Sequence, residues 1–409
     1  KGGKILHMLR KYLGDEAFFK SLKLYLTKFS FKTAEYTDLR KSFEEVTGED
    51  LTWFFDQWYL KGGHPTITSS YRKEANKTVL TISQKHNFDT SFIYKLPLDI
   101  DVYTGDIAKR KRIVLNKAKD SFEIYEQDVK AVVVDGTNSL VGVKTEVRPV
   151  EDWVFVLQNS DSYLDKSTAI RKLKNHKGKD IVKNALFDAL SSPKSRVVTS
   201  AIKMIESSWL EKEEKWNTKL IEIAKQNIRG TTRAAALEKL AENKDLKKYE
   251  DLVAEKLKDS SYSVEDEALK FLTKIDSNKA LEYAKANINR NHFGLISTIY
   301  ELIGNNKNPQ DSQLFINGID QAKGYKKIAI YMNYGKYLAS MSANTVDEKL
   351  VEFEKMITSD DDIEVYCAKS ALGSMKSEFS KNSDAKSKER MAQIEKIIAK
   401  AKTKDEEEG

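Results

Sequence analysis

The chain has 409 residues, 40% of them hydrophobic and 32% charged, and this length exceeds one ordinary hydrophobic core, so we expect a globular protein of two to four domains. Its 69 basic and 62 acidic residues are well mixed and give a net charge of +7, which argues against a nucleic-acid partner, because such proteins more often gather positive charge on one face. No apolar run approaches the roughly 20 residues that a membrane span requires.

Residues 1–62 are predicted to form about four short helices. In the opening stretch, KGGKILHMLRKYLGDEAFFKSLKLYL, Ile5, Leu9 and Leu13 fall on one helical face. Gly14 then supplies a helix stop. The later stretch LTWFFDQWYLKGGHP carries several large aromatic residues on one short helix. So many aromatic rings require a large partner surface, which this region alone cannot supply.

Residues 63–149 are predicted to form a small β-sandwich, because the hydrophobic period changes to two between turn residues. The expected strands are TVLTISQ, YKLPLDIDVYTG, KRIVLN, SFEIYE and KAVVVDG. The basic run Lys109-Arg110-Lys111-Arg112 is interpreted as a solvated hairpin rather than a phosphate site, since no aromatic or glycine pattern accompanies it. Asn76-Lys77-Thr78 matches a glycosylation acceptor, but a plain loop is the preferred interpretation.

Residues 150–409 are predicted to be a HEAT- or armadillo-like α-solenoid. A short pattern, Ala, then Ile or Leu, then two residues and another aliphatic residue, recurs at intervals of 32 to 35 residues. Its copies begin at Ala169, Ala201, Ala236 and Ala268, with a fainter copy in which Thr298 replaces the alanine. The alternative interpretation is an irregular helical bundle. Residues 377–409 are expected to be a charged helix with a fraying tail that caps the repeats.

Zinc hydrolysis needs a ligand pair one helical turn apart, usually H-E-x-x-H, with a third ligand and a general base. None of the five histidines has another histidine within four residues, and none is followed by Glu. These residues are His7, His64, His86, His176 and His292. We expect no metal ligands in this chain. His7 is interpreted as packed or solvated, and His64 as a structural residue in the turn between domains.

Other catalytic chemistry is equally without a motif. The single cysteine, Cys367, allows neither an internal disulfide nor a cysteine-built metal site, and its setting predicts a helix-core residue. The sequence has no G-x-S-x-G elbow and no phosphate-binding glycine loop. Asp360-Asp361-Asp362 lacks the alternating ligands of a calcium loop and fits a helix start. No catalytic residue is therefore predicted, and the substrate-binding residues are unknown.

The first 65 residues resemble the aminopeptidase N-like family of zinc metallopeptidases. In that family the catalytic domain ends with a Lys-Gly pair before an apolar helix, a Leu-Gly-Asp turn followed by Phe, an Asp-Leu helix, and a Trp ahead of a Gly-x-Pro junction. The matching residues are Lys1-Gly2, Leu13-Gly14-Asp15 with Phe18, Asp38-Leu39, Trp58 and Gly63-His64-Pro65. The later order, a β-sandwich followed by HEAT-like helices, is also similar, although only as architecture after residue 150.

The resemblance implies zinc bound by two histidines and a glutamate, a second glutamate that activates water, a G-x-M-E-N-type motif for the substrate's amino terminus, and a tyrosine for the oxyanion. In the family all of these lie upstream of the position that Lys1 matches, so no catalytic residue is assigned here. The chain is accordingly expected to be the C-terminal part of an aminopeptidase, inactive and without zinc by itself. Residues 1–62 would then normally contact the missing catalytic half. Without that half, they would contact the solenoid or another copy of the chain.

Two alternatives remain at this stage. Some family members that have lost their zinc ligands serve as scaffolds, which use the solenoid surface for protein contacts. The residues of this chain do not distinguish such a scaffold from an active aminopeptidase. A free-standing solenoid adaptor would leave the ordered matches before residue 65 unexplained. The expected partners are peptide substrates and the catalytic half of the same chain. The sequence does not indicate localisation, side-chain specificity or oligomeric state.

Overall fold

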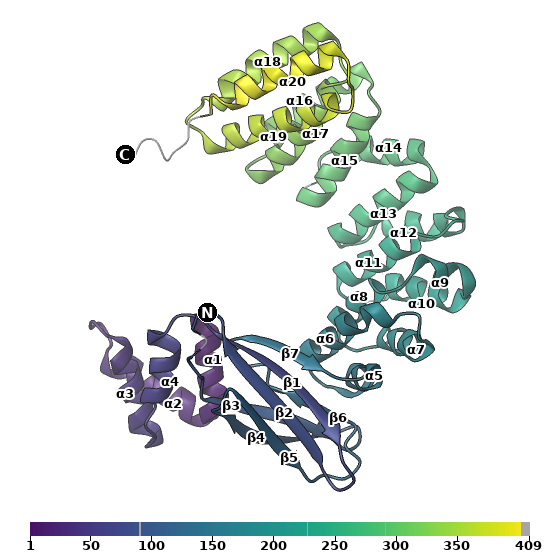
Figure 1. The fold of residues 1–409 in the computed structure, drawn as a ribbon. Coiled ribbons are helices and arrows are strands. Elements are labelled where there is room, and N and C mark those ends of the chain that lie inside the picture. Colours follow the sequence, from purple (N-terminus) through teal and green to yellow (C-terminus); the bar gives the residue numbers. More distant parts are fainter. Residues whose placement is uncertain (90, 227, 291, 402–409) are drawn as a thin grey trace. The chain divides into compact units, whose positions relative to one another are not determined.

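A computed structural model describes residues 1–89, 91–226, 228–290 and 292–401 of the chain (Figure 1). It is mainly helical with a small sheet region, as the sequence predicts. The chain falls into two compact units, Lys1–Met204 and Ile205–Gly409. Within the described ranges, no helix combines the length and the apolar character that crossing a membrane requires.

The first helices follow the sequence prediction closely. They are α1 (Gly2–Leu13), α2 (Asp15–Lys28), α3 (Tyr36–Thr47) and α4 (Thr52–Phe55), which continues into a π-helical turn (Asp56–Leu60). Gly14 separates α1 from α2 with φ 84°, and Gly48 ends α3 with φ 69° in the left-handed region that favours glycine.

Seven strands form two sheets among the residues that the structure describes. They are β1 (Pro65–Lys73), β2 (Thr78–His86), β3 (Leu96–Tyr103), β4 (Ala108–Leu115), β5 (Lys119–Ile124), β6 (Ala131–Val134) and β7 (Val143–Val147). One sheet has the order β5-β2-β1-β7, with β1 and β7 parallel, and the other has the order β4-β3-β6. The five expected strands overlap β2 to β6. Strands β1 and β7 escaped the sequence prediction because β1 is largely polar and β7 is short and charged.

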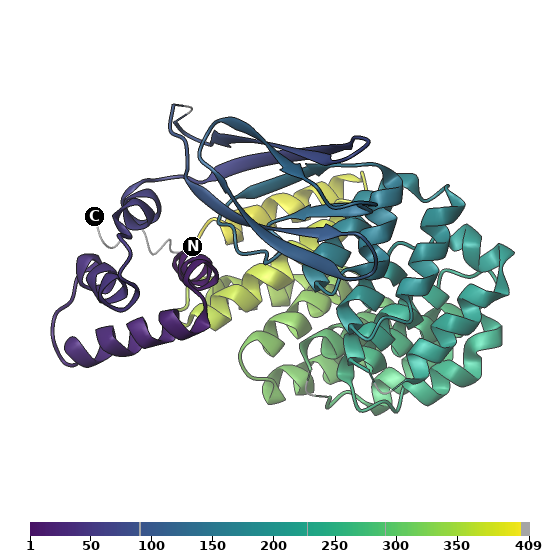
Figure 2. The ribbon, with the colours of Figure 1, turned by 90° about the horizontal axis from the view of Figure 1, so that it is seen from below.

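The helices of residues 1–60 pack on the sheets, and both views show α1 beside the strands (Figures 1 and 2). One hydrophobic cluster includes Leu9, Phe55 and Trp58 from the helices, Ile82 from one sheet and Ile100 from the other. The sequence prediction did not include the sheets among the partners of these helices. The apolar faces of the two sheets supply part of the partner surface that the aromatic residues require.

The described part of the first unit ends with the α-helices α5 (Val150–Asn159), α6 (Tyr163–Leu173), α7 (Asp180–Ala189) and α8 (Ser195–Ile202). Helices α6 and α8 carry the first two copies of the repeated pattern and pack against each other. Their alanines, Ala169 and Ala201, are fully buried. A small buried side chain at this position allows two helices to approach closely.

The regular elements described in the second unit are helices. They are α9 (Ser207–Lys212), α10 (Glu214–Lys225), α11 (Gly230–Leu240), α12 (Glu250–Lys256), α13 (Tyr262–Ile275), α14 (Ser277–Ala286), α15 (Phe293–Asn305), α16 (Ser312–Gln321), α17 (Tyr325–Leu338), α18 (Ala343–Ile357), α19 (Asp362–Phe379) and α20 (Ala385–Ile398). Helices α11, α13, α15, α17 and α19 pack against one another in sequence order. Ala236 and Ala268 are fully buried in the first two of these. The choice between a solenoid and an irregular bundle stays a prediction.

The C-terminal segment differs from the single charged helix expected over residues 377–409. Residues 377–379 still belong to α19, and α20 begins only at Ala385. The break occurs where Asp384 caps α20, accepting a 2.9 Å hydrogen bond from the Ser387 N–H. The expected fraying tail, residues 402–409, lies outside the described residues.

Candidate functional site

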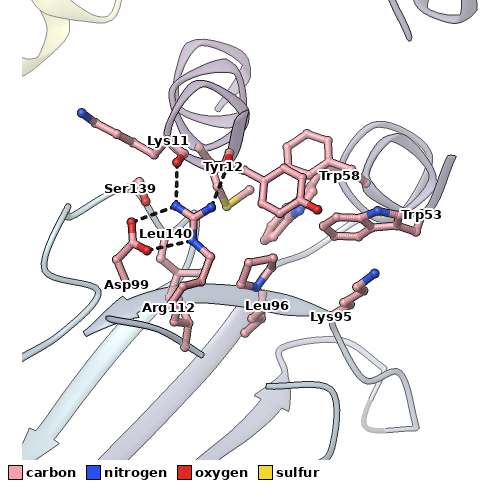
Figure 3. A pocket seen from close by; sticks show the side chains of 14 residues that line it. Lys11, Tyr12, Trp53, Trp58, Lys95, Leu96, Asp99, Arg112, Ser139 and Leu140 are labelled. Carbon is pink, nitrogen blue, oxygen red and sulfur yellow. Dashed lines mark hydrogen bonds and ion pairs between the residues drawn. The ribbon is translucent and has the colours of Figure 1, made fainter. Parts of the chain in front are cut away.

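Arg112 joins strand β4 to the C-terminal end of α1 (Figure 3). Its guanidinium donates 2.8 Å hydrogen bonds from Nη1 to the carbonyl oxygen of Tyr12 and from Nη2 to that of Lys11. A helix C-terminus leaves carbonyl groups without intrahelical partners and carries partial negative charge, so a cation there is favourable. Arg112 Nε also donates to Asp99 Oδ1 over 2.8 Å, and this hydrogen bond raises the pKa of the guanidinium. A charged side chain thus holds the first helix against the sheet.

Aromatic rings form a wall of the small cavity beside Arg112 (Figure 3). Tyr12 and Trp53 meet edge to face with their ring centroids 5.7 Å apart, and Nζ of Lys95 lies 4.4 Å from the Trp53 ring centroid. The Tyr12 hydroxyl donates to Glu49 over 3.0 Å. The cavity has a volume of about 20 Å³, room for about one water molecule. We therefore interpret the cavity as a small gap in the packing between the first helices and the sheet, and not as a substrate site.

The π-helical turn Asp56–Leu60 makes a second connection to the sheets. The side chain of Gln57 donates from Nε2 to the Lys95 carbonyl oxygen over 3.1 Å, and its Oε1 accepts from the Lys95 N–H over 2.8 Å. The Trp58 ring lies 5.0 Å from the ring of Tyr94, measured between centroids. Because π-helical turns often occur at functional sites, this turn is a feature of interest, but its observed contacts are structural.

His86 is buried and uses both ring nitrogens for backbone contacts. Its Nδ1 accepts hydrogen bonds from the N–H groups of Phe88 and Asp89, at 3.0 and 2.7 Å. The proton is therefore assigned to Nε2, which donates to the carbonyl oxygen of Gly62 over 3.0 Å. The ring also stacks on Tyr94. With both nitrogens engaged, His86 connects the loop after β2 to the junction after the helices and is not free to bind a metal.

The basic run Lys109–Arg112 lies on β4 and is exposed, as predicted, but it also forms ion pairs. In the antiparallel register, Arg110 lies opposite Asp101 and Arg112 opposite Asp99. Both pairs are bonded, with Nε–Oδ1 distances of 2.7 and 2.8 Å. The interpretation of a merely solvated hairpin missed these partners. The sequence contained a signal for these ion pairs, the pattern D-x-D on one strand and R-x-R on the next. Side chains that lie opposite each other on one face of antiparallel strands interact directly.

The remaining histidines lie in separate places. His7 is half-buried on α1, and burial together with Lys11 and Lys4 lowers the pKa of its imidazole. His64 donates its backbone N–H to Asn87 Oδ1 over 2.8 Å, and His176 is exposed after α6. His292 stacks on Tyr262 at 5.3 Å. Over the described residues, no group of three or more His, Cys, Asp or Glu could hold a metal ion, so these residues do not fit a zinc site.

Three other sequence interpretations have a clear structural outcome. Cys367 is buried within α19, as predicted, and burial raises the pKa of its thiol to about 11. Asp361 caps α19 by accepting from the Ile363 N–H over 2.8 Å, which confirms the helix-start interpretation. Asn76 is an exposed residue in the turn between β1 and β2.

Comparison with known proteins shows which family these helices are similar to. Residues 1–58, which include α1 to α4 and part of the lining of the Arg112 cavity, match the Peptidase family M1 domain. The chain is 26% identical over 208 residues to "Probable aminopeptidase 1" of Sulfurisphaera tokodaii, a match covering 47% of this chain and 26% of that protein. It is 32% identical over 136 residues to "Leucyl aminopeptidase" of Saccharolobus solfataricus, covering 33% of this chain and 17% of that protein.

A solved structure of Legionella pneumophila aminopeptidase A in complex with aspartic acid is similar to this chain with a TM-score of 0.57. The match covers 97% of this chain and 56% of that one at 12% identity, and at this identity it shows the fold alone. Together these matches make the chain M1 aminopeptidase-like, in agreement with the resemblance of the first 65 residues. The matched regions span about a quarter or less of the curated relatives.

Proposed function

We propose that this chain is the C-terminal part of a zinc-dependent aminopeptidase that hydrolyses N-terminal residues from peptides. The observation that carries the proposal is the match of residues 1–58 to the M1 peptidase domain, combined with described residues that do not fit a zinc site. On this proposal the metal ligands belong to a preceding part of the whole protein. Zinc bound there would supply activated water for attack on the peptide bond.

An exposed apolar surface on the first helices supports this division. One side of α1 to α4 packs on the sheets, yet several large apolar side chains remain in solvent. Phe31 is fully exposed, Leu26 is 65% exposed, Leu60 58% and Phe19 51%. On this proposal these side chains belong to one contact surface, since large exposed apolar patches mark such surfaces. The occupant that fits the family match is the rest of the M1 catalytic domain.

The rest of the chain, on this proposal, divides as its sequence periods suggest. Residues 1–62 end the catalytic domain, residues 63–149 form a β-sandwich spacer, and residues 150–409 form HEAT-like repeats that close over the substrate cavity. Two observations support this division. Both sheets contribute to one hydrophobic cluster, and the repeated alanines of the helical region are fully buried. A closed cavity of this kind would admit peptides and exclude large folded proteins.

The test compares residues 1–409 with the whole protein that includes the upstream residues. Zinc is measured by metal analysis of the purified proteins, and activity by hydrolysis of an aminoacyl reporter. The whole protein is expected to retain stoichiometric zinc and to cleave the reporter, whereas residues 1–409 do neither. Stoichiometric zinc or hydrolysis in residues 1–409 alone contradicts the proposal. A folded whole protein with neither property would support the scaffold alternative instead.

A further inference from the structure

A pocket of about 300 Å³ lies within residues 205–409. It is lined by residues just after α14, by α15 and α16, and by the start of α17, which follow one another along the chain. Pockets that bind small ligands have volumes of roughly 300–1,000 Å³, so this pocket is large enough for a small organic molecule. Neither the sequence motifs nor the proposed zinc chemistry assigns it a role.

The floor of the pocket is apolar. It is made by Ile296, Tyr300 and Ile330, which are 4%, 1% and 2% exposed. Gly318 makes room for the tyrosine, because a Cβ atom at this glycine would lie 1.6 Å from the Tyr300 hydroxyl oxygen. That hydroxyl donates to the Leu314 carbonyl over 3.5 Å, at the long limit of a hydrogen bond. The tyrosine thus combines an apolar ring with a hydroxyl that is weakly bonded and close to the pocket wall.

The rim of the pocket is cationic. Arg290, Lys323 and Lys326 line it, and among the described residues that line the pocket none is acidic. Arg290 is fixed in place by an ion pair with Glu265, with a distance of 2.8 Å between Nε and Oε1. Amide groups of Asn289 and Gln321 add further hydrogen-bond donors. An apolar floor beneath several cations suits a ligand with one apolar end and one anionic end.

We propose that this pocket binds a small organic anion in which a carboxylate is joined to an apolar group. The apolar group packs on Ile296, Ile330 and the ring of Tyr300, where it loses contact with water. The carboxylate pairs with the cations at the rim, and such charge-assisted hydrogen bonds are stronger than neutral ones. This chemistry has two sources, the C-terminal residue of a peptide and a free carboxylic acid. The inference does not depend on the proposed zinc chemistry.

The experiment measures binding to residues 1–409 by isothermal titration calorimetry with three small probes. N-Acetylleucine represents a peptide's C-terminal residue, octanoate represents a free acid, and N-acetylleucinamide has the apolar group without the charge. At least one of the two acids is expected to bind saturably and at least tenfold more tightly than the amide. The double variant Lys323→Gln/Lys326→Gln is expected to weaken that binding tenfold or more.

The matched control is the double variant Lys307→Gln/Lys386→Gln, which removes two lysines from a different pocket of the same unit and should leave binding unchanged. Circular dichroism checks that both variants are folded. Tighter binding of N-acetylleucine assigns the pocket to a peptide end, and tighter binding of octanoate assigns it to a free acid. The proposal is overturned if neither acid binds saturably, if the amide binds as tightly as the acids, or if both double variants lose binding equally.

Discussion

At the scale of single residues, Arg112 connects two parts of the fold that are far apart in sequence. It satisfies the last carbonyl groups of α1 across a separation of about 100 residues, while Asp99 on the neighbouring strand holds its guanidinium in position. Arg110 makes the same kind of pair with Asp101, but its Nη2 donates to the Gly136 carbonyl over 3.3 Å instead of to the end of α1. The two arginines therefore form a natural pair for measuring what the connection to the helix contributes.

Arg112→Ala is expected to destabilise the protein more than Arg110→Ala does. Each change removes one strand-to-strand ion pair, but only Arg112→Ala leaves the Lys11 and Tyr12 carbonyls without their charged donor, at a cost of about 1–3 kcal/mol. Urea denaturation measures the free energy of unfolding, and hydrogen exchange reports the opening of α1. Equal losses in the two variants would show that the contact with the helix contributes little.

The thiol of Cys367 is expected to react slowly in the folded protein. Burial raises its pKa to about 11, so the reactive thiolate is scarce at pH 8 and increases as the pH rises toward that value. A thiol-specific colorimetric reagent measures the rate, first in buffer and then in urea. The rate should rise at least tenfold on unfolding, whereas a rapid reaction in buffer would mean that the thiol is accessible.

At the scale of elements, the repeated alanines are buried on helices that pack against each other, α6 with α8 and α11 with α13. Thr298 on α15 is an informative exception, because its Oγ1 donates to Asp266 Oδ1 on α13 over 2.5 Å. The fainter copy of the pattern thus replaces small-side-chain packing with a hydrogen bond between neighbouring helices. The amide of Asn333 on α17 donates to the Ser297 carbonyl of α15 over 3.1 Å, so the next pair is connected in a similar way.

Ala268→Leu is expected to destabilise the second unit by about 1–3 kcal/mol, because the added side chain overpacks a fully buried helix contact. Ala254→Leu is the matched control, since Ala254 is an exposed residue of α12 and leucine is a good helix former. Thermal unfolding followed by circular dichroism compares the two. If the Ala268→Leu protein is as stable as the control, the helices do not pack closely at this position.

At the scale of the whole molecule, the first helices have two apolar surfaces, one buried and one exposed to solvent. The surface that includes Phe55 and Trp58 is covered by the sheets. The surface that includes Leu26 and Phe31 is open, and the proposed function assigns it to the rest of the catalytic domain. Because of this open surface, we expect residues 1–409 to associate when they are prepared alone.

Leu26→Ser combined with Phe31→Ser is expected to reduce association of residues 1–409 without loss of stability, because neither side chain is buried. Phe88→Ser is the control, since Phe88 is 79% exposed but lies in the loop after β2, away from these helices in sequence. Sedimentation velocity over a range of concentrations measures association. If the control reduces association as strongly as the double variant, the surface on the first helices is not responsible.

Much of the local structure could be predicted from the sequence. Gly14 marks the end of the first helix, and the Ala-centred pattern identifies the buried side of α11 and α13. The prediction failed where an element's pattern was weak or where the partner was distant. Strand β7 is too short and charged to show a period, and the break before α20 depends on one capping residue, Asp384.

The sequence by itself determined which side is buried in each helix and strand that has a clear hydrophobic period. Its first 65 residues also determined the similarity to M1 aminopeptidases. Only the tertiary structure decided what those buried sides contact. It packs α1 to α4 on two sheets and brings Arg112 to the end of α1. It also places Arg290, Lys323 and Lys326 at the pocket lined by α15, α16 and the start of α17. The physical reason is that hydrophobic periodicity records the loss of contact with water, and burial is non-directional. The identity of the partner follows from contacts between residues that the sequence keeps far apart.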